Sequence, residues 1–222
     1  MDALMRRRQM MTAGGEPPAP APVFYDYLVF DGTAYIDTDI VPDANASYRV
    51  SLGDETIKAT QRLFLVPAEN NTQIGAIFGT GTTSSIRQFS AYYGASSSVV
   101  SGKNLYFSVG RFTLFLTPKR FGWGSTSYTF TKGDNAPSGG IILGINTAHQ
   151  GQPYSGKMSV FRIYGSDAQD ATSASDLLDN YTPVYTLRPC TYLGEAGIWC
   201  EETSTFYGNT ANAGTLTVEN QA

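Results

Sequence analysis

The chain has 222 residues, of which 15% are charged and 41% hydrophobic, and its formal net charge is −4. An acidic chain with so few charges does not have the basic surface of a nucleic-acid-binding protein, so we expect no nucleic-acid partner. It contains no apolar run of about 18 residues, and we therefore expect no membrane span.

The first residues differ in composition from the rest of the chain. Residues 1–11, MDALMRRRQMM, hold four of the five methionines and three of the ten arginines. They lack the apolar region of about 7–15 residues that a secretory signal needs, so we expect no Sec export. Residues 12–22, TAGGEPPAPAP, combine glycines with alternating prolines and predict an extended linker. We interpret residues 1–11 as a tail that docks on a partner through Met1, Met5, Arg6, Arg7, Arg8, Met10 and Met11.

The remaining residues, 23–222, have the pattern of one all-β domain. Runs of β-branched and aromatic residues recur between clusters of Gly, Asn, Asp, Pro and Ser, which predicts a sandwich or barrel. Residues 157–164 alternate most clearly, and we expect their even and odd positions to face opposite sides of a sheet. One short helix is expected at 173–181, with Ser173 or Ser175 as its cap and Leu177, Leu178 and Tyr181 as its apolar stripe. The expected strands are 27–30, 35–38, 47–52, 62–66, 76–78, 89–93, 105–109, 112–116, 121–123, 128–130, 141–145, 158–164, 185–187, 198–200 and 216–218.

The two cysteines, Cys190 and Cys200, do not form a recognisable motif. They lie ten residues apart and outside a C-x-x-C spacing, which excludes a zinc ribbon and a disulfide-dense scaffold. We expect free buried thiols, because cysteine behaves as a small apolar residue in protein cores. One local bridge between them is the alternative.

The residues needed for catalysis are missing or badly placed. His149 is the single histidine and lies in a loop without a G-x-S-x-G motif, which argues against a serine or cysteine triad. A glycosidase needs two carboxylates about 5–9.5 Å apart, but the pairs Asp54–Glu55 and Glu201–Glu202 are adjacent and point to opposite faces of a strand. Asp37 and Asp39 share a face, where we interpret them as solvated surface residues. We expect no enzymatic activity, no cofactor and no metal.

Binding without chemistry requires less from the sequence. Exposed aromatic rings stack on sugars, while amides and hydroxyls on loops give hydrogen bonds. Trp123, Tyr154, Tyr92 and Tyr93 lie near glycines that indicate turns, so these rings are our candidates for a ligand-binding surface. The alternative is that they belong to the core.

Three segments resemble one family. Residues 27–38, YLVFDGTAYIDT, are similar to the start of a recurring concanavalin A-like (laminin-G-like, LamG) module of gut bacteria and their phages. FRIYGSDAQDAT and LRPCTYLGEAGIWCEETSTFYGNTANAGTLTV resemble later parts of the same module. The sequence departs from it at Trp199–Cys200–Glu201, where a Tyr-Asp pair is usual, and at Asp39, which replaces a glycine. The resemblance implies a two-sheet antiparallel jelly-roll sandwich of the lectin type.

The tail adds a second resemblance. MDALMRRRQMM is similar to short N-termini of virion proteins from Bacteroides-type phages, including crAss-like ones. Together the resemblances imply a phage structural protein, a head fibre, capsid decoration or tail appendage, made in the host cytoplasm and displayed on the virion surface. Its expected partners are capsid or tail proteins at residues 1–11, further copies in a trimer or dimer, and host surface polysaccharide. The alternatives are a decoration without ligand, a carbohydrate-active enzyme and a bacterial surface lectin.

Overall fold

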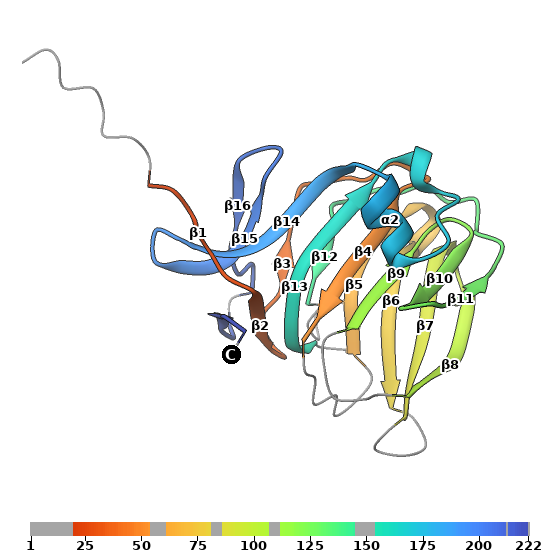
Figure 1. Ribbon diagram of the computed structural model, residues 1–222, viewed down its shortest axis with the longest axis horizontal. Coiled ribbons are helices and arrows are strands. Elements are labelled where there is room, and N and C mark those ends of the chain that lie inside the picture. The colour runs from red at the N-terminus through yellow and green to blue at the C-terminus, as the bar shows by residue number, and fades with distance from the viewer. Residues whose placement is uncertain are drawn as a thin grey trace, which may run out of the picture.

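A computed structural model describes residues 20–53, 61–80, 86–106, 112–144, 154–211 and 213–221. Within them the chain forms two antiparallel β-sheets (Figure 1). The smaller sheet has the order β3 (Ile36–Asp37), β12 (Ile142–Leu143), β5 (Gln61–Ala68), β6 (Thr72–Thr80), β7 (Ile86–Ala95) and β8 (Val100–Tyr106). The larger sheet has the order β11 (Thr126–Thr129), β10 (Arg120–Trp123), β9 (Phe112–Leu116), β4 (Ser47–Leu52), β13 (Ser155–Tyr164), β14 (Pro183–Tyr192), β15 (Glu195–Cys200) and β16 (Thr205–Tyr207).

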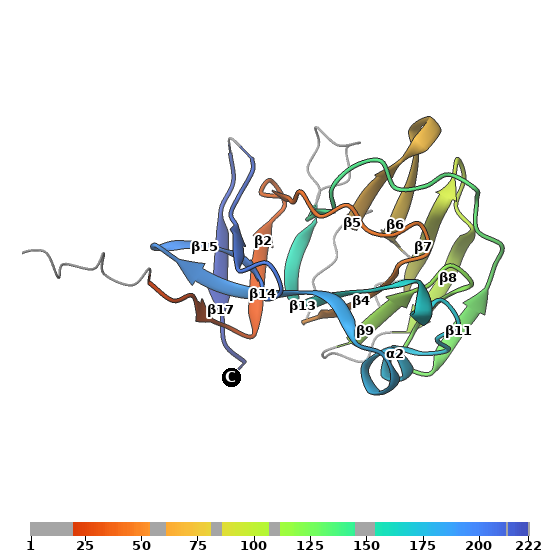
Figure 2. The same cartoon turned by 90° about the horizontal axis from the view of Figure 1, so that it is seen from above.

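Three further strands join the larger sheet beside this path. β1 (Val23–Phe24) pairs with β14, while β2 (Tyr27–Asp31) pairs with both β13 and β17 (Leu216–Glu219). Both β2 and β14 therefore use the same edge of β13, each along a different half of it. Seen from above, the helix α2 (Ala174–Asn180), the strands β9 and β4, and the strands β5 to β7 form successive layers (Figure 2). This architecture confirms the expected two-sheet antiparallel sandwich.

The main core fills the space between the two sheets. Tyr48 and Phe161 of the larger sheet meet Phe64 of the smaller one, with ring centroids 5.3 Å and 5.1 Å from that of Phe64. All three side chains are at most 1% exposed. Tyr93 of the smaller sheet forms a second contact between the sheets: its hydroxyl donates a 2.6 Å hydrogen bond to the carbonyl of Ala46, directly before β4. Burial raises the pKa of Tyr93, so this hydroxyl stays a donor at neutral pH.

Strand β13 departs from the expected strict alternation. Its pairing with β4 shifts register between Met158 and Phe161, as at a β-bulge. Met158, Phe161 and Ile163 consequently share the core face, although one is an even and two are odd positions. The even–odd prediction for 157–164 is therefore wrong across the bulge.

Helix α2 covers part of the outer face of the larger sheet. It starts after Ser173, whose hydroxyl accepts a 3.0 Å hydrogen bond from the Asp176 N–H, so the first of the two expected caps is correct. Leu177 is buried against Phe115, while Leu178 is 46% exposed. The helix thus buries only part of the expected stripe.

The segment Asp31–Thr33 joins the two ends of the domain. The Asp31 carboxylate accepts hydrogen bonds from the N–H groups of Thr33 (2.8 Å), Ala34 (2.9 Å) and Thr215 (2.5 Å), and from the Thr33 hydroxyl. Burial alone would raise its pKa, but these donors outweigh that effect and lower the pKa from 3.8 to about 2. The Asp31 side chain therefore stabilises the D-G-T turn through hydrogen bonds and also fixes the residues before β17.

We expect Asp31→Asn to lower the free energy of unfolding at neutral pH by about 1 kcal/mol, which is about 2–4 °C in Tm for a domain of this size. A group whose folded pKa is depressed stabilises the fold above its unfolded pKa and loses that effect as the pH falls. The difference in the free energy of unfolding between variant and parent therefore has its full size above pH 3.8, and it disappears as the pH falls through about 2. Calorimetry across this range, with the exposed Asp134→Asn as a control, checks it; a pH-independent difference would refute it.

Both cysteines are free and buried, as expected. In the β14–β15 ladder Cys190 lies opposite Gly197, whereas Cys200 lies opposite Leu187. The two thiols therefore occupy different rows of the sheet. Burial raises the pKa of Cys190 to about 11, which keeps it protonated and unreactive at neutral pH.

Candidate functional site

The aromatic residues predicted to stand out from the surface mostly lie inside the domain. Trp123 is 9% exposed, Tyr93 1% and Tyr154 0%, and all three are part of the main core. The prediction that these rings form an exposed stacking surface is wrong. Tyr92 is half-buried on β7, where the guanidinium of Arg62 lies 5.8 Å from its ring centroid.

Several other sequence-based candidates fall outside the described residues. Met1, Met5, Arg6–Arg8, Met10 and Met11 belong to this group, as do His149 and the pair Asp54–Glu55. The anchoring tail and the first part of the linker therefore stay predictions.

A pocket lies at the open edge of the sandwich, close to the buried Trp123. It has a volume of about 400 Å³, within the range of about 300–1,000 Å³ that is usual for small-molecule sites. We call it the edge pocket. It lies between β8, the edge strand of the smaller sheet, and β11, the edge strand of the larger sheet. Its lining consists of Val99, Val100, Ser101, Lys103, Ser127, Tyr128 and Thr129.

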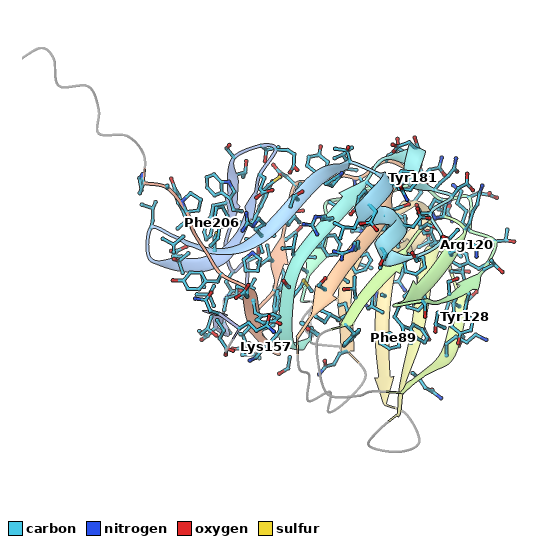
Figure 3. All side chains as sticks on the ribbon, viewed as in Figure 1. Phe89, Arg120, Tyr128, Lys157, Tyr181 and Phe206 are labelled. Atoms are coloured by element: carbon cyan, nitrogen blue, oxygen red, sulfur yellow. The ribbon has the colours of Figure 1, made fainter. Side chains whose placement is uncertain are left out.

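A series of side chains leads from the core to this pocket. The rings of Phe89 and Trp123 are stacked, with centroids 5.3 Å apart and planes at 29°. Tyr128 follows Trp123 at 5.6 Å, and the Lys103 ammonium lies 5.0 Å from the Tyr128 ring centroid. Because Lys103 pairs with Phe89 across β7 and β8, its side chain is directed towards the gap between the sheets. Phe89 and Tyr128 are visible at the same end of the molecule in Figure 3.

The edge pocket offers donors and acceptors rather than reactive groups. Its four hydroxyl side chains both donate and accept hydrogen bonds, and its lysine donates three. The half-buried Tyr128 ring adds an apolar edge. This set of groups suits the hydroxyls of a sugar and one negatively charged substituent, and the described part of the lining contains no carboxylate for acid–base chemistry.

Three of the carboxylates considered for catalysis take part in structural contacts, and Asp37, the fourth that the structure describes, is exposed, as expected. Glu201 forms a 2.9 Å ion pair with Arg188, and Glu202 accepts a 2.7 Å hydrogen bond from the Thr186 N–H. Asp39 accepts a hydrogen bond from the Tyr207 hydroxyl in a second pocket of about 390 Å³. Of the described residues that line this second pocket, Asp39 is the single carboxylate.

Sequence reasoning missed a group of aromatic residues on the outer face of the larger sheet. Trp199 lies directly opposite Arg188 on one side and Phe206 on the other. Tyr192 contacts both aromatic neighbours, with centroid distances of 5.4 Å to Trp199 and 5.6 Å to Phe206. We call these three half-buried residues the aromatic strip. Phe206 lies at the end of the molecule opposite Tyr128 (Figure 3).

No family model and no curated protein matches the sequence. The fold is similar to a solved structure, the native heptameric SAP-like pentraxin from Limulus polyphemus, with a TM-score of 0.54 and 10% sequence identity. The match covers 87% of this chain and 94% of the pentraxin chain. The chain therefore has the expected concanavalin A-like jelly-roll fold. Among the described residues, no helix is long and apolar enough to cross a membrane.

Proposed function

We propose that this protein is a structural component of a phage virion whose lectin-like domain binds glycans of the host surface. Residues 1–11 anchor it to capsid or tail proteins, as a head fibre, capsid decoration or tail appendage made in the host cytoplasm. The observation that carries the proposal is that the linker and the edge pocket lie at opposite ends of the domain. β1, which follows the linker, lies at one end of the long axis, and β8 and β11 with the edge pocket lie at the other (Figure 1).

The linker suits this arrangement. Its prolines favour an extended chain of about 3.1 Å per residue, so residues 12–22 span roughly 34 Å. An anchored domain on such a spacer presents its distal edge pocket away from the particle. Many copies per particle convert weak sugar contacts into useful avidity, and we expect the copies to associate as a trimer or dimer.

The described carboxylates support binding rather than cleavage. Glu201 and Glu202 are engaged with Arg188 and the backbone of Thr186, and Asp39 with Tyr207. A glycosidase needs two carboxyl groups that flank the same bond, and the described lining of neither the edge pocket nor the second pocket holds two. We therefore propose that the domain holds its glycan without hydrolysing it.

A purely structural decoration is the second candidate. The aromatic strip lies on the same part of the larger sheet as β1, which pairs with β14 beside Cys190. Large half-buried rings at the end that carries β1 and the linker suit contact with the particle or with a neighbouring copy. In this case the domain needs no ligand at its distal end.

We expect the full chain to bind a subset of host capsular polysaccharides on a glycan array, and Lys103→Ala to weaken this binding about tenfold or more. Lys103 supplies the single positive charge among the described residues that line the edge pocket, and a hydrogen bond from a charged donor contributes about 1.5–3 kcal/mol. Lys119→Ala is the matched control, because Lys119 is exposed and pairs with Asp170 outside the pocket.

The outcomes separate the two candidates. Equal losses for both lysine variants would place the glycan elsewhere, and an array without any signal would favour the decoration without ligand. Chromatography of the bound polysaccharide after incubation tests the absence of cleavage, because shortened chains would identify a hydrolase.

A further inference from the structure

A groove with three arginines lies on the outer face of the larger sheet, away from the edge pocket. We call it the arginine groove. Its volume is about 310 Å³. Part of its wall is the segment after β1, where the Tyr25 N–H donates a 3.0 Å hydrogen bond to the Pro189 carbonyl. The groove is lined by Tyr25, Asp26, Arg49, Ser51, Ser159, Val160, Arg162 and Arg188.

The strand register brings the arginines together. Arg49 on β4 and Arg162 on β13 lie directly opposite each other in the antiparallel ladder. Like charges in directly opposite positions destabilise a sheet. Arg188 on β14 is two residues beyond Thr186, the partner of Arg162 on its other side, so all three side chains emerge on one face.

The surrounding contacts hold the guanidinium groups in place. Arg188 is fixed by its ion pair with Glu201 and by the Phe24 ring, whose centroid is 4.3 Å from the guanidinium carbon. Arg49 donates a 3.1 Å hydrogen bond from Nε to the Ala174 carbonyl of helix α2. In the part of the chain that the structure describes, Arg162 takes part in none of the ion pairs.

The groove is positive although the chain is acidic. Among the described residues, three guanidinium groups line the groove with one carboxylate, Asp26, and the carboxylate of Glu201 pairs with Arg188, so one positive charge remains in excess. Asp26 accepts a hydrogen bond from the Gln221 N–H. Ser51 and Ser159, residues that are 8% and 7% exposed, add hydroxyls, and the Ser51 hydroxyl shares a 3.0 Å hydrogen bond with that of Thr113. Guanidinium groups match the two oxygens of a carboxylate, sulfate or phosphate, and hydroxyls donate to the remaining oxygens.

We propose that the arginine groove is a binding site for an oxyanion, a sulfate, phosphate or carboxylate group, held between Arg49, Arg162 and Arg188. The oxyanion is free in solution or carried by an acidic saccharide. This site lies on a different face from the edge pocket and does not depend on the adhesion function proposed above. The bound anion offsets the repulsion between Arg49 and Arg162.

Titration calorimetry of the full chain with inorganic phosphate, a sulfated oligosaccharide and its desulfated form tests the site. We expect both anions to bind, the desulfated form not to bind, and Arg162→Gln to weaken anion binding about tenfold or more. Arg120→Gln removes the same charge on β10, outside the groove, and leaves binding unchanged. Equal affinities for phosphate and saccharide identify a free oxyanion as the ligand, whereas a much tighter saccharide identifies a carried one.

Two results would overturn the proposal: equal losses in Arg162→Gln and Arg120→Gln, or binding of the desulfated form as tight as that of the sulfated one. The Tm of Arg162→Gln without anion should equal or exceed that of the parent, because the substitution removes the repulsion with Arg49. If this variant does not fold, Arg162→Lys keeps the charge but loses the two-pronged geometry. It should then show a partial loss of affinity, and parent-like affinity would refute the site.

Discussion

Replacing Trp123 by alanine is expected to lower the free energy of unfolding by about 3–5 kcal/mol. The side chain is 9% exposed and contacts Phe89 at 5.3 Å, Tyr128 at 5.6 Å and Phe121 at 6.1 Å between ring centroids. Its removal leaves a cavity that these rings fill only in part, because each is held by its own strand. For a domain of this size the loss corresponds to a decrease in Tm of roughly 6–20 °C.

Trp199→Ala is the matched control for this measurement. Trp199 is half-buried in the aromatic strip and contacts Tyr192 at 5.4 Å, so its truncation should cost less than that of Trp123. Denaturant unfolding of both variants gives the comparison, with unchanged m-values showing that the unfolded states are alike. A Trp123→Ala variant as stable as the parent would place this ring at the surface.

Trp123→Ala also affects the edge pocket indirectly. Tyr128 rests on the indole ring of Trp123, and Lys103 lies over Tyr128. Loss of the indole leaves Tyr128 without its support, so glycan affinity should fall even in the folded fraction. Binding measured well below the Tm of the variant separates this effect from unfolding.

The sequence predicts the sandwich well because the signals for strands are local. Alternation and turn residues place β4 and β9 at the positions where the structure has them. Ser173 is recognisable as a cap because a hydroxyl before an apolar run satisfies a free N–H group. The sequence does not predict the very short strands β1 and β16, because their two or three residues carry no periodic pattern.

The burial of Trp123 was not predictable from its neighbours. Gly122 and Gly124 indicate a turn, which led to the expectation of an exposed ring. Gly122 has a different function, because a Cβ at this position would lie 2.1 Å from the Thr126 carbonyl oxygen. Only Gly124, with a φ of 51°, serves the turn. One glycine therefore permits close strand approach, and the indole beside it faces the core.

Neither binding region has a local sequence signal. The edge pocket joins residues 99–103 with residues 127–129, which belong to edge strands of different sheets. The arginine groove joins Arg49, Arg162 and Arg188, which come together only when β13 lies between β4 and β14. Until the strand order is known, single charged residues in separate strands cannot be distinguished from ordinary solvent-exposed residues.

Deleting residues 1–11 is expected to abolish incorporation into virions while the Tm of the sandwich stays unchanged. The strand pairings of the described domain extend from Val23 to Glu219, so the deletion removes none of them. The deleted residues contain four methionines and three arginines, and the proposed docking has the methionines fill an irregular apolar groove and the arginines pair with acidic groups. The measurement is the amount of protein that co-purifies with particles from hosts expressing the parent or the truncated chain.

Two further variants identify what the tail contributes. A scrambled tail keeps the composition and charge but loses the order of the residues, and it should fail like the deletion if docking is specific. Replacement of Arg6, Arg7 and Arg8 together by alanine should weaken docking, and it should make the remaining docking less sensitive to salt, because screening acts first on exposed ion pairs. If truncated protein co-purifies with particles at the parent level, the attachment site lies within the sandwich itself, and the aromatic strip beside β1 becomes the region to test next.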